Sequence, residues 1–242
     1  MPSTTAFDHI ALALPRMADA VPFLVGVLGG EPHSGARGGP EFRFGTWRYA
    51  NGGKLEVIEP IGEDGFVSRF LAARGPGVHH VTFKVPSLDA ACDRARQRGY
   101  DIVGYDDSFP DWKTAFLHPK QALGIVVQFA QTSGAGEPRR WTPPATVENP
   151  PPAVSVLGLR MRVSDPERAR LQWEEILHGT CASRDPKRLV YVWPDSPMVL
   201  TIDVDPSGGE GPLCVELAAA RPVTLPAGPV PALGTSFRLA QT

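Results

Sequence analysis

The chain has 242 residues, of which 42% are apolar and 21% charged, the balance of an ordinary globular protein. Its formal net charge of −2 argues against a nucleic-acid partner, because nucleic-acid binders normally carry a basic patch. No apolar run approaches the length of a membrane span, and the start shows no signal-peptide pattern. Three widely spaced cysteines without a CxxC pair argue against a disulfide framework and a thiolate zinc site. We therefore expect a cytoplasmic protein with no membrane partner.

The first part of the chain predicts a strand, a helix and a hairpin. A strand is expected over 7–14, followed by an amphipathic helix that ends at Gly29-Gly30. Residues 42–50 and 54–59 are typical of strands, and the turn signal Asn51-Gly52-Gly53 joins them. A short helix is expected around residues 64–74.

The same order then returns. A strand over 78–85 leads to Ser87, a favourable N-cap for a helix that Gly99 closes. Three further strands are expected, over 101–105, 113–118 and 124–130. A strand, a helix and three strands, twice over, indicate an internal duplication within residues 5–131.

Four residues with metal-binding side chains fall at equivalent places in the two copies. His9 and His80 are 71 residues apart in the first strand of each copy, and Glu56 and Gln128 are 72 apart in the fourth. If the copies pack about a pseudo-twofold axis, all four side chains can meet. Nitrogen and oxygen ligands of this kind suit a divalent ion such as Zn, Mn, Co, Ni or Fe.

His79 and Glu59 also have ligand chemistry, but neighbouring residues of a strand point to opposite faces. The alignment of the copies places His80 on His9, so His79 and Glu59 are assigned to the faces that point away from the site.

Composition changes after Gln131. Residues 132–153 are rich in proline and predict a linker. Residues 154–242 predict a third, degenerate unit with a tail: a strand over 154–163, a helix from the capping sequence at Ser164 to Leu177, and strands near 189–193, 199–204 and 213–218. Gly158 falls where His9 and His80 lie, so this unit is expected to be free of ligands. Its apolar face should pack on the first domain or on another subunit, as in a homodimer.

Four segments of the chain resemble one known family in the same order: Asp8-His9-Ile10-Ala11, Leu55-Glu56-Val57-Ile58-Glu59-Pro60, Gly77-Val78-His79-His80-Val81 and Ala115-Phe116-Leu117-His118-Pro119-Lys120. This family is the vicinal oxygen chelate superfamily, and the resemblance is greatest to its methylmalonyl-CoA epimerase-like members. It implies an α+β fold of tandem βαβββ modules, here two paired modules and a third degenerate one. It also implies a bound divalent metal and a small-molecule substrate.

One departure from the family bears on the chemistry. Epimerase-like members carry glutamine at the position of Glu56 and glutamate at that of Gln128, the reverse of this chain. Gln128 cannot ionise, so it cannot act as the general base that the family places there. The catalytic candidates are therefore Glu56, from the symmetry-related side, and Glu41.

The resemblance implies a metal-dependent isomerase or lyase that forms an enolate from an acyl-CoA or α-oxo substrate. Trp47, Lys113 and His118 are the candidate substrate-binding residues. Two alternatives remain open. One is a ring-cleaving dioxygenase, and the other is a non-catalytic protein that binds a small molecule, as resistance proteins of this superfamily do.

Overall fold

The first repeat forms a parallel strand pair extended by a hairpin. The computed structural model describes residues 4–133 and 141–240, and all statements on structure refer to these. The elements of the repeat are β1 (Ala6–Ala13), η1 (Met17–Ala20), α1 (Val21–Leu24), β2 (Glu31–Arg37), β3 (Phe42–Arg48) and β4 (Lys54–Pro60). Strand β4 pairs parallel with β1 and antiparallel with β3, and β3 pairs antiparallel with β2. Pro22 lies in the first turn of α1, where a missing backbone N–H costs nothing, and the helix is short.

The second repeat has the same pairing. Helix α2 (Phe66–Arg74) leads into it, and its elements are β5 (Gly77–Lys84), α3 (Leu88–Gln97), β6 (Ile102–Asp106), β7 (Lys113–Leu117) and β8 (Val126–Gln131). Strand β8 pairs parallel with β5 and antiparallel with β7. The Ser87 hydroxyl accepts a 3.2 Å hydrogen bond from the backbone N–H of Ala90, so Ser87 caps α3 as predicted.

The third repeat follows the same plan. Its elements are β9 (Ser155–Val163), α4 (Pro166–Arg170), the π-helix η2 (Leu171–Ile176), β10 (Thr180–Asp185), β11 (Arg188–Val192) and β12 (Val199–Val204). The N-cap of α4 is Asp165, whose side chain accepts a 2.8 Å hydrogen bond from the backbone N–H of Glu167; Ser164 does not cap the helix. Strands β13 (Gly211–Ala218) and β14 (Ser236–Leu239) also pair parallel, as the first and last strands of each repeat do. They correspond to a fourth repeat reduced to these two strands.

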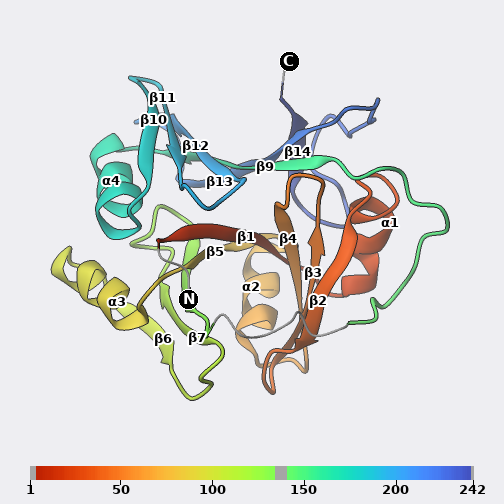
Figure 1. Ribbon diagram of the computed structural model, residues 1–242, viewed down its shortest axis with the longest axis horizontal. Helices are drawn as coiled ribbons and strands as arrows, with labels where there is room; N and C mark the ends of the chain where they lie inside the picture. Colours follow the sequence, from red (N-terminus) through yellow and green to blue (C-terminus); the bar gives the residue numbers. More distant parts are fainter. Residues whose placement is uncertain (1–3, 134–140, 241–242) are drawn as a thin grey trace. The chain divides into compact units, whose positions relative to one another are not determined.

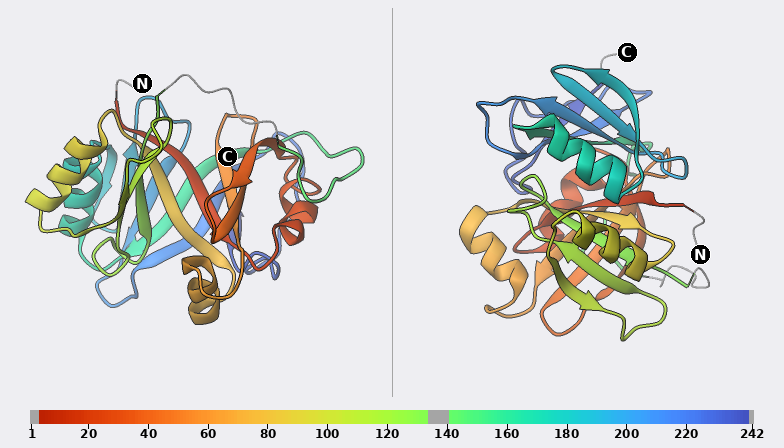
Figure 2. Two further views of the ribbon diagram at one scale, coloured as in Figure 1. Left: turned by 90° about the horizontal axis from the view of Figure 1, so that it is seen from below. Right: turned by 90° about the vertical axis from the view of Figure 1, so that its left-hand side faces the viewer.

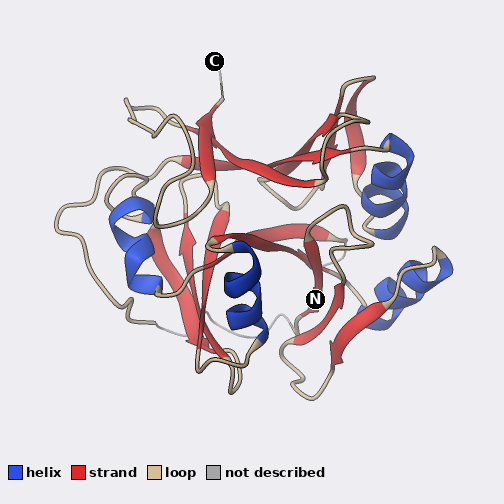
Figure 3. Cartoon of the chain, turned by 180° about the vertical axis from the view of Figure 1, so that it is seen from behind, coloured by secondary structure: helices blue, strands red, loops and turns tan. Residues whose placement is uncertain are grey.

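Two sheets result within the described residues, with strand orders β2-β3-β4-β1-β5-β8-β7-β6 and β10-β11-β12-β9-β13-β14. Strands predominate and helices are few and short (Figure 3). This arrangement of repeated modules confirms the predicted α+β class with tandem βαβββ units.

The chain divides into two compact units, each of which draws on both halves of the sequence. The His9 unit comprises residues 9–79, 141–157 and 214–240, and the His80 unit comprises residues 4–8, 80–133 and 158–213. In the His9 unit, β2, β3 and β4 run side by side with α1 to one side (Figure 1). Asn51 ties the start of β9 to the β3–β4 turn, because its side chain donates to Val156 O and accepts from Val156 N.

The His80 unit contains an aromatic cluster that joins its sequence segments. Phe7 stacks on Phe83 with ring centroids 5.0 Å apart, and Trp193 lies 4.8 Å and Trp173 5.9 Å from Phe83. Helix α3 runs beside α4 and η2 (Figure 2), and Arg94 Nε donates to Ile176 O at 3.1 Å. Residues of the third repeat therefore cover apolar side chains of β1 and β5.

Three strands have no counterpart among the sequence predictions: β2, β10 and β14. Strands β2 and β10 each lie at an edge of a sheet, and most of their side chains are at least partly exposed. An exposed edge strand need not alternate apolar and polar residues, so the pattern that marks a half-buried strand is missing. The β14 strand lies in the C-terminal tail, for which the sequence predicts no regular secondary structure.

All three cysteines are free thiols. None of the described helices has the length and apolar composition needed to cross a membrane.

Candidate metal centre

Strand register brings His9 and Glu56 together. In the parallel pair β1–β4, Glu56 lies opposite Ala11, two residues beyond His9 and on the same face of the sheet. The two side chains are 5% and 11% exposed, and His9 Nε2 lies 3.6 Å from Glu56 Oε1. From β3, the Thr46 hydroxyl donates to Glu56 Oε2 at 3.5 Å.

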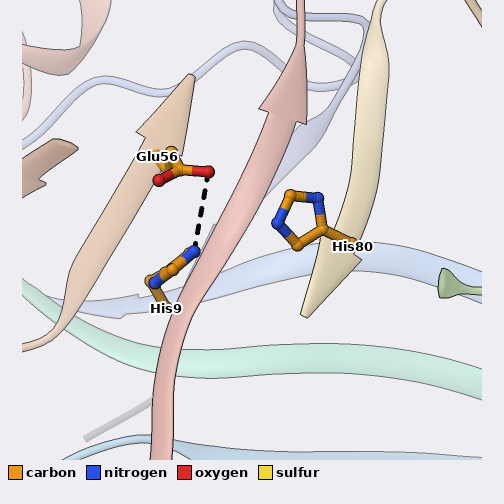
Figure 4. Close-up of side chains that lie close together, drawn as sticks. All are labelled: His9, Glu56 and His80. Carbon is orange, nitrogen blue, oxygen red and sulfur yellow. Dashed lines mark ion pairs between the residues drawn. The ribbon is translucent and has the colours of Figure 1, made fainter. Parts of the chain in front are cut away.

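His80 completes a group with this pair. One ligand atom from each of His9, Glu56 and His80 lies within 4.8 Å of the others, and all three residues are buried. Figure 4 shows the three side chains on β1, β4 and β5 turned toward one another. The group thus contains the predicted ligands that have an imidazole or a carboxylate side chain.

The donor set suits a divalent cation. Two imidazole nitrogens and one carboxylate oxygen are common ligands of Zn²⁺, Fe²⁺ and related ions. With metal–ligand bonds of about 2.0–2.2 Å, two ligand atoms of one ion are separated by at most about 4.4 Å, close to the 4.8 Å limit of this group. The geometry therefore fits a metal ion but does not distinguish one divalent metal from another.

Gln128, the fourth predicted ligand, occupies the position in β8 that Glu56 occupies in β4. It pairs with Thr82, two residues beyond His80 and on the same face. The Thr82 hydroxyl donates a 2.7 Å hydrogen bond to Gln128 Oε1, and Thr82 is fully buried. Thr82 is not among the site residues that the sequence pattern predicts. Ala11 stands at the equivalent place in the first repeat, so the duplication offers no signal for it.

His79 lies outside the group. Its ring packs 4.8 Å from Phe70 and 5.5 Å from Phe66, both in α2. Burial, with a smaller effect from the charge of Arg74, lowers the pKa of His79 to about 4, so the ring is neutral near pH 7. His79 thus points away from the metal group, as strand parity predicts, and the side of β5 on which it lies is buried.

Glu41 and Trp47 are not brought to the group. Glu41 is exposed and precedes Thr46 by five residues, about 16 Å along an extended strand. Trp47 is fully buried, and its neighbour Thr46 occupies the Glu56 face, so Trp47 lies on the opposite face. Its ring lies 5.0 Å from that of Trp141 in an edge-on contact, which gives Trp47 a place in the core.

Lys113 and His118 lie on and just beyond β7. Phe116 faces Gln128, so strand parity places Lys113, three residues earlier, on the opposite face. His118 is exposed, and its Nδ1 accepts a 3.2 Å hydrogen bond from the backbone N–H of Lys120. The structure shows a turn-stabilising role for His118, and a contact with substrate stays a prediction.

The third repeat carries no ligand at the equivalent positions. Gly158 corresponds to the histidines, and Thr201 corresponds to Glu56 and Gln128. A Cβ atom at Gly158 would lie 1.9 Å from Val199 O, and the φ angle of Gly158 is +149°. Any side chain here would clash with β12, which explains the absence of a histidine.

Residues 8–116 match the family model of the Glyoxalase/Bleomycin resistance protein/Dioxygenase superfamily. An ethylmalonyl-CoA/methylmalonyl-CoA epimerase from Cereibacter sphaeroides is 28% identical over 131 residues, which are 51% of this chain and 96% of that protein.

Solved structures extend the likeness in fold to nearly the whole chain. A mutant 4-hydroxymandelate synthase from Streptomyces coelicolor aligns with a TM-score of 0.64 and 16% identity, over 90% of this chain and 72% of that one. A hypothetical protein from Staphylococcus aureus aligns with a TM-score of 0.66 and 10% identity, over 98% of both chains. Residues 8–116 are therefore similar in sequence to this superfamily, and the solved structures extend the likeness in fold alone.

Proposed function

We propose that this protein is a divalent-metal enzyme of the isomerase or lyase type, which removes a proton next to a carbonyl group of an acyl-CoA or α-oxo substrate. The observation that carries the proposal is the buried group of His9, Glu56 and His80. The 28% identity to an ethylmalonyl-CoA/methylmalonyl-CoA epimerase supports the choice of substrate class.

His9, Glu56 and His80 would hold the ion. When bound, a divalent ion acts as a Lewis acid that makes the C–H next to a coordinated carbonyl more acidic. Two neutral histidines and one glutamate leave a formal charge of +1 on such a site, which favours an anionic substrate. Burial of the three side chains strengthens these electrostatic interactions, because little water screens them.

Glu56 is the carboxylate of the group and is the proposed proton acceptor. Its Oε2, the oxygen that Thr46 contacts, differs from the Oε1 that lies nearest His9, so the two oxygens have separate surroundings. Gln128 occupies the position in the second repeat that Glu56 occupies in the first. An amide does not take up a proton, so Gln128 is not a second acid or base. One ionisable carboxylate supports removal and return of a proton from one side of the substrate.

Metal analysis followed by isotope exchange tests the proposal. The purified protein is loaded with Co²⁺, Mn²⁺, Zn²⁺ or Fe²⁺ and incubated in D₂O with methylmalonyl-CoA or an α-oxo acid, and deuterium incorporation is followed by NMR. We expect exchange with at least one metal, and at least a 100-fold slower exchange for Glu56→Gln, which removes the base. Equal exchange rates for the wild type and Glu56→Gln would contradict the assignment of the base.

A ring-cleaving dioxygenase is the second candidate, because two histidines and one carboxylate with open positions are typical of non-haem Fe²⁺ oxygenases. Consumption of oxygen by the Fe²⁺-loaded protein with a catechol, but not by the Zn²⁺-loaded protein, would favour it. If a small molecule binds equally well with and without metal and neither reaction occurs, a resistance-type binding protein is favoured instead. A cytoplasmic location and a homodimer stay predictions.

A further inference from the structure

Only the oxygen of the Gln128 amide forms a hydrogen bond with the described residues. Its oxygen accepts the 2.7 Å hydrogen bond from Thr82 described above. Its nitrogen donates to no atom of the described residues, and it is not among the unbonded polar atoms that the protein fully encloses. The NH₂ group is therefore not fully enclosed, although Gln128 as a whole is only 8% exposed.

Thr82 fixes which end of the amide is engaged. Its hydroxyl is fully buried, and Gln128 Oε1 is its acceptor among the described residues. Turning the amide by 180° would put the NH₂ group against Thr82 and leave the buried hydroxyl proton without an acceptor, which is unfavourable. The first repeat has no such constraint, since Ala11 stands in the place of Thr82.

The register places Gln128 on the face of the sheet that carries His80. Glu56 pairs with the residue two positions beyond His9 and reaches within 3.6 Å of that histidine. Gln128 pairs with the residue two positions beyond His80, a member of the group. A side chain at this position is therefore suitably placed to meet whatever the group binds.

We propose that Gln128 is a hydrogen-bond donor to an oxygen of the substrate and not a fourth metal ligand. The inference rests on the proposed metal site and defines the substrate more closely. The substrate presents an oxygen acceptor, such as a carboxylate or an enolate oxygen, to a neutral N–H on the strand that pairs with the strand of His80. Thr82 is a positioning residue that keeps the N–H in this orientation.

The test uses Co²⁺ as the metal and oxalate as a probe with two adjacent oxygens, both measured by calorimetry and by the visible spectrum of Co²⁺. For Gln128→Leu, we expect Co²⁺ affinity within about 3-fold of the wild type. Oxalate affinity of the Co²⁺-loaded protein should fall about 10-fold or more, the value of one hydrogen bond to a charged acceptor.

Thr82→Val is the test of positioning. The valine variant releases the amide, which can then turn its oxygen toward the ion. Co²⁺ affinity should be unchanged or higher, while oxalate affinity should fall. Thr201→Val, the same substitution at a buried threonine in the ligand-free third repeat, is the matched control and should change neither affinity.

Four results would overturn the inference. A loss of Co²⁺ affinity above 10-fold in Gln128→Leu would make Gln128 a ligand, and an unchanged oxalate affinity would exclude the donor role. If Gln128→Leu does not fold, the Gln128→Glu variant is measured in its place. Oxalate should bind this variant more weakly than the wild type, because a carboxylate replaces the N–H donor. Tighter oxalate binding would contradict the proposal. A wild-type protein that binds no Co²⁺ would refute the metal site itself, and the role of Gln128 with it.

Discussion

Glu56 lies 3.6 Å from His9, and the strand register that produces this contact is repeated between Gln128 and His80. The duplicated site is therefore symmetric in backbone position and asymmetric in chemistry. One repeat supplies a carboxylate, which can carry charge and accept a proton, and the other supplies a neutral amide. The two repeats therefore offer different chemistry at equivalent backbone positions.

Removal of either histidine should abolish metal binding. We expect one divalent ion per chain in the wild type and less than a tenth of that occupancy in His9→Ala and in His80→Ala, because two remaining ligands hold an ion weakly. Inductively coupled plasma mass spectrometry of the dialysed proteins measures the stoichiometry. Full occupancy in both variants would refute the site.

His79 provides the matched control for His80. His79→Ala should keep the metal, because the ring packs against Phe66 and Phe70 and belongs to no ligand group. The variant should instead lose about 1–3 kcal/mol of unfolding free energy, as expected when a buried side chain is truncated. Urea denaturation and metal analysis measure the two effects. Metal loss equal to that of His80→Ala would mean that the register of β5 differs by one residue.

Truncation at about residue 135 should leave the ligands but expose apolar surface. Phe7 and Phe83 are at most 1% exposed and would lose the rings of Trp173 and Trp193. We expect metal binding to persist with lower solubility or a changed subunit number, measured by sedimentation. A truncated protein as soluble, as stable and of the same subunit number as the full chain would show that residues 154–242 are an independent domain.

Within the full chain, Trp193→Ala tests the same contact. Its ring is 2% exposed, and its Nε1 donates a 2.8 Å hydrogen bond to Leu177 O. We expect a loss of about 3–5 kcal/mol of unfolding free energy in a denaturant titration. A loss below about 1 kcal/mol would mean that the aromatic cluster adds little to stability.

The ion pairs of Asp203 should make stability depend on pH. Burial raises the pKa of Asp203, but hydrogen bonds and charges from Arg160 and Arg188 outweigh it, so its pKa lies below the usual value. Arg160 forms two of these bonds, at 2.7 and 2.9 Å. A carboxyl group with a lowered folded-state pKa contributes stability above its unfolded pKa of about 3.9 and loses that contribution as the pH falls through the folded value.

Asp203→Asn should therefore cost about 1–2 kcal/mol at pH 7, a value reduced for the partial exposure of the pair. The difference from the wild type should shrink as the pH falls below about 4, when the Asp203 carboxyl group of the unfolded chain begins to protonate while that of the folded chain is still ionised. Urea denaturation at pH 7, 5 and 3 measures it. A difference independent of pH would mean that the effect arises from packing and not from charge.

The sequence by itself determined the repeat and the positions of the site. The 71- and 72-residue spacings identify equivalent strand positions, and the two-residue period of a strand separates His80 from His79. These features are local or periodic, so they can be read along the chain without knowledge of its contacts. The same pattern could not reveal the exposed edge strands β2 and β10, because buried and exposed side chains do not alternate along them.

Tertiary structure decided how individual side chains are used. The sequence places Trp47 near the site. In the structure its side chain is buried on the opposite face of the sheet, where it packs in the core. The sequence presents Gln128 as a ligand, but a hydroxyl 46 positions away engages the amide oxygen. The reason is physical: repeat spacing specifies where a residue lies on the backbone, whereas the orientation of its polar atoms depends on partners brought close only by folding.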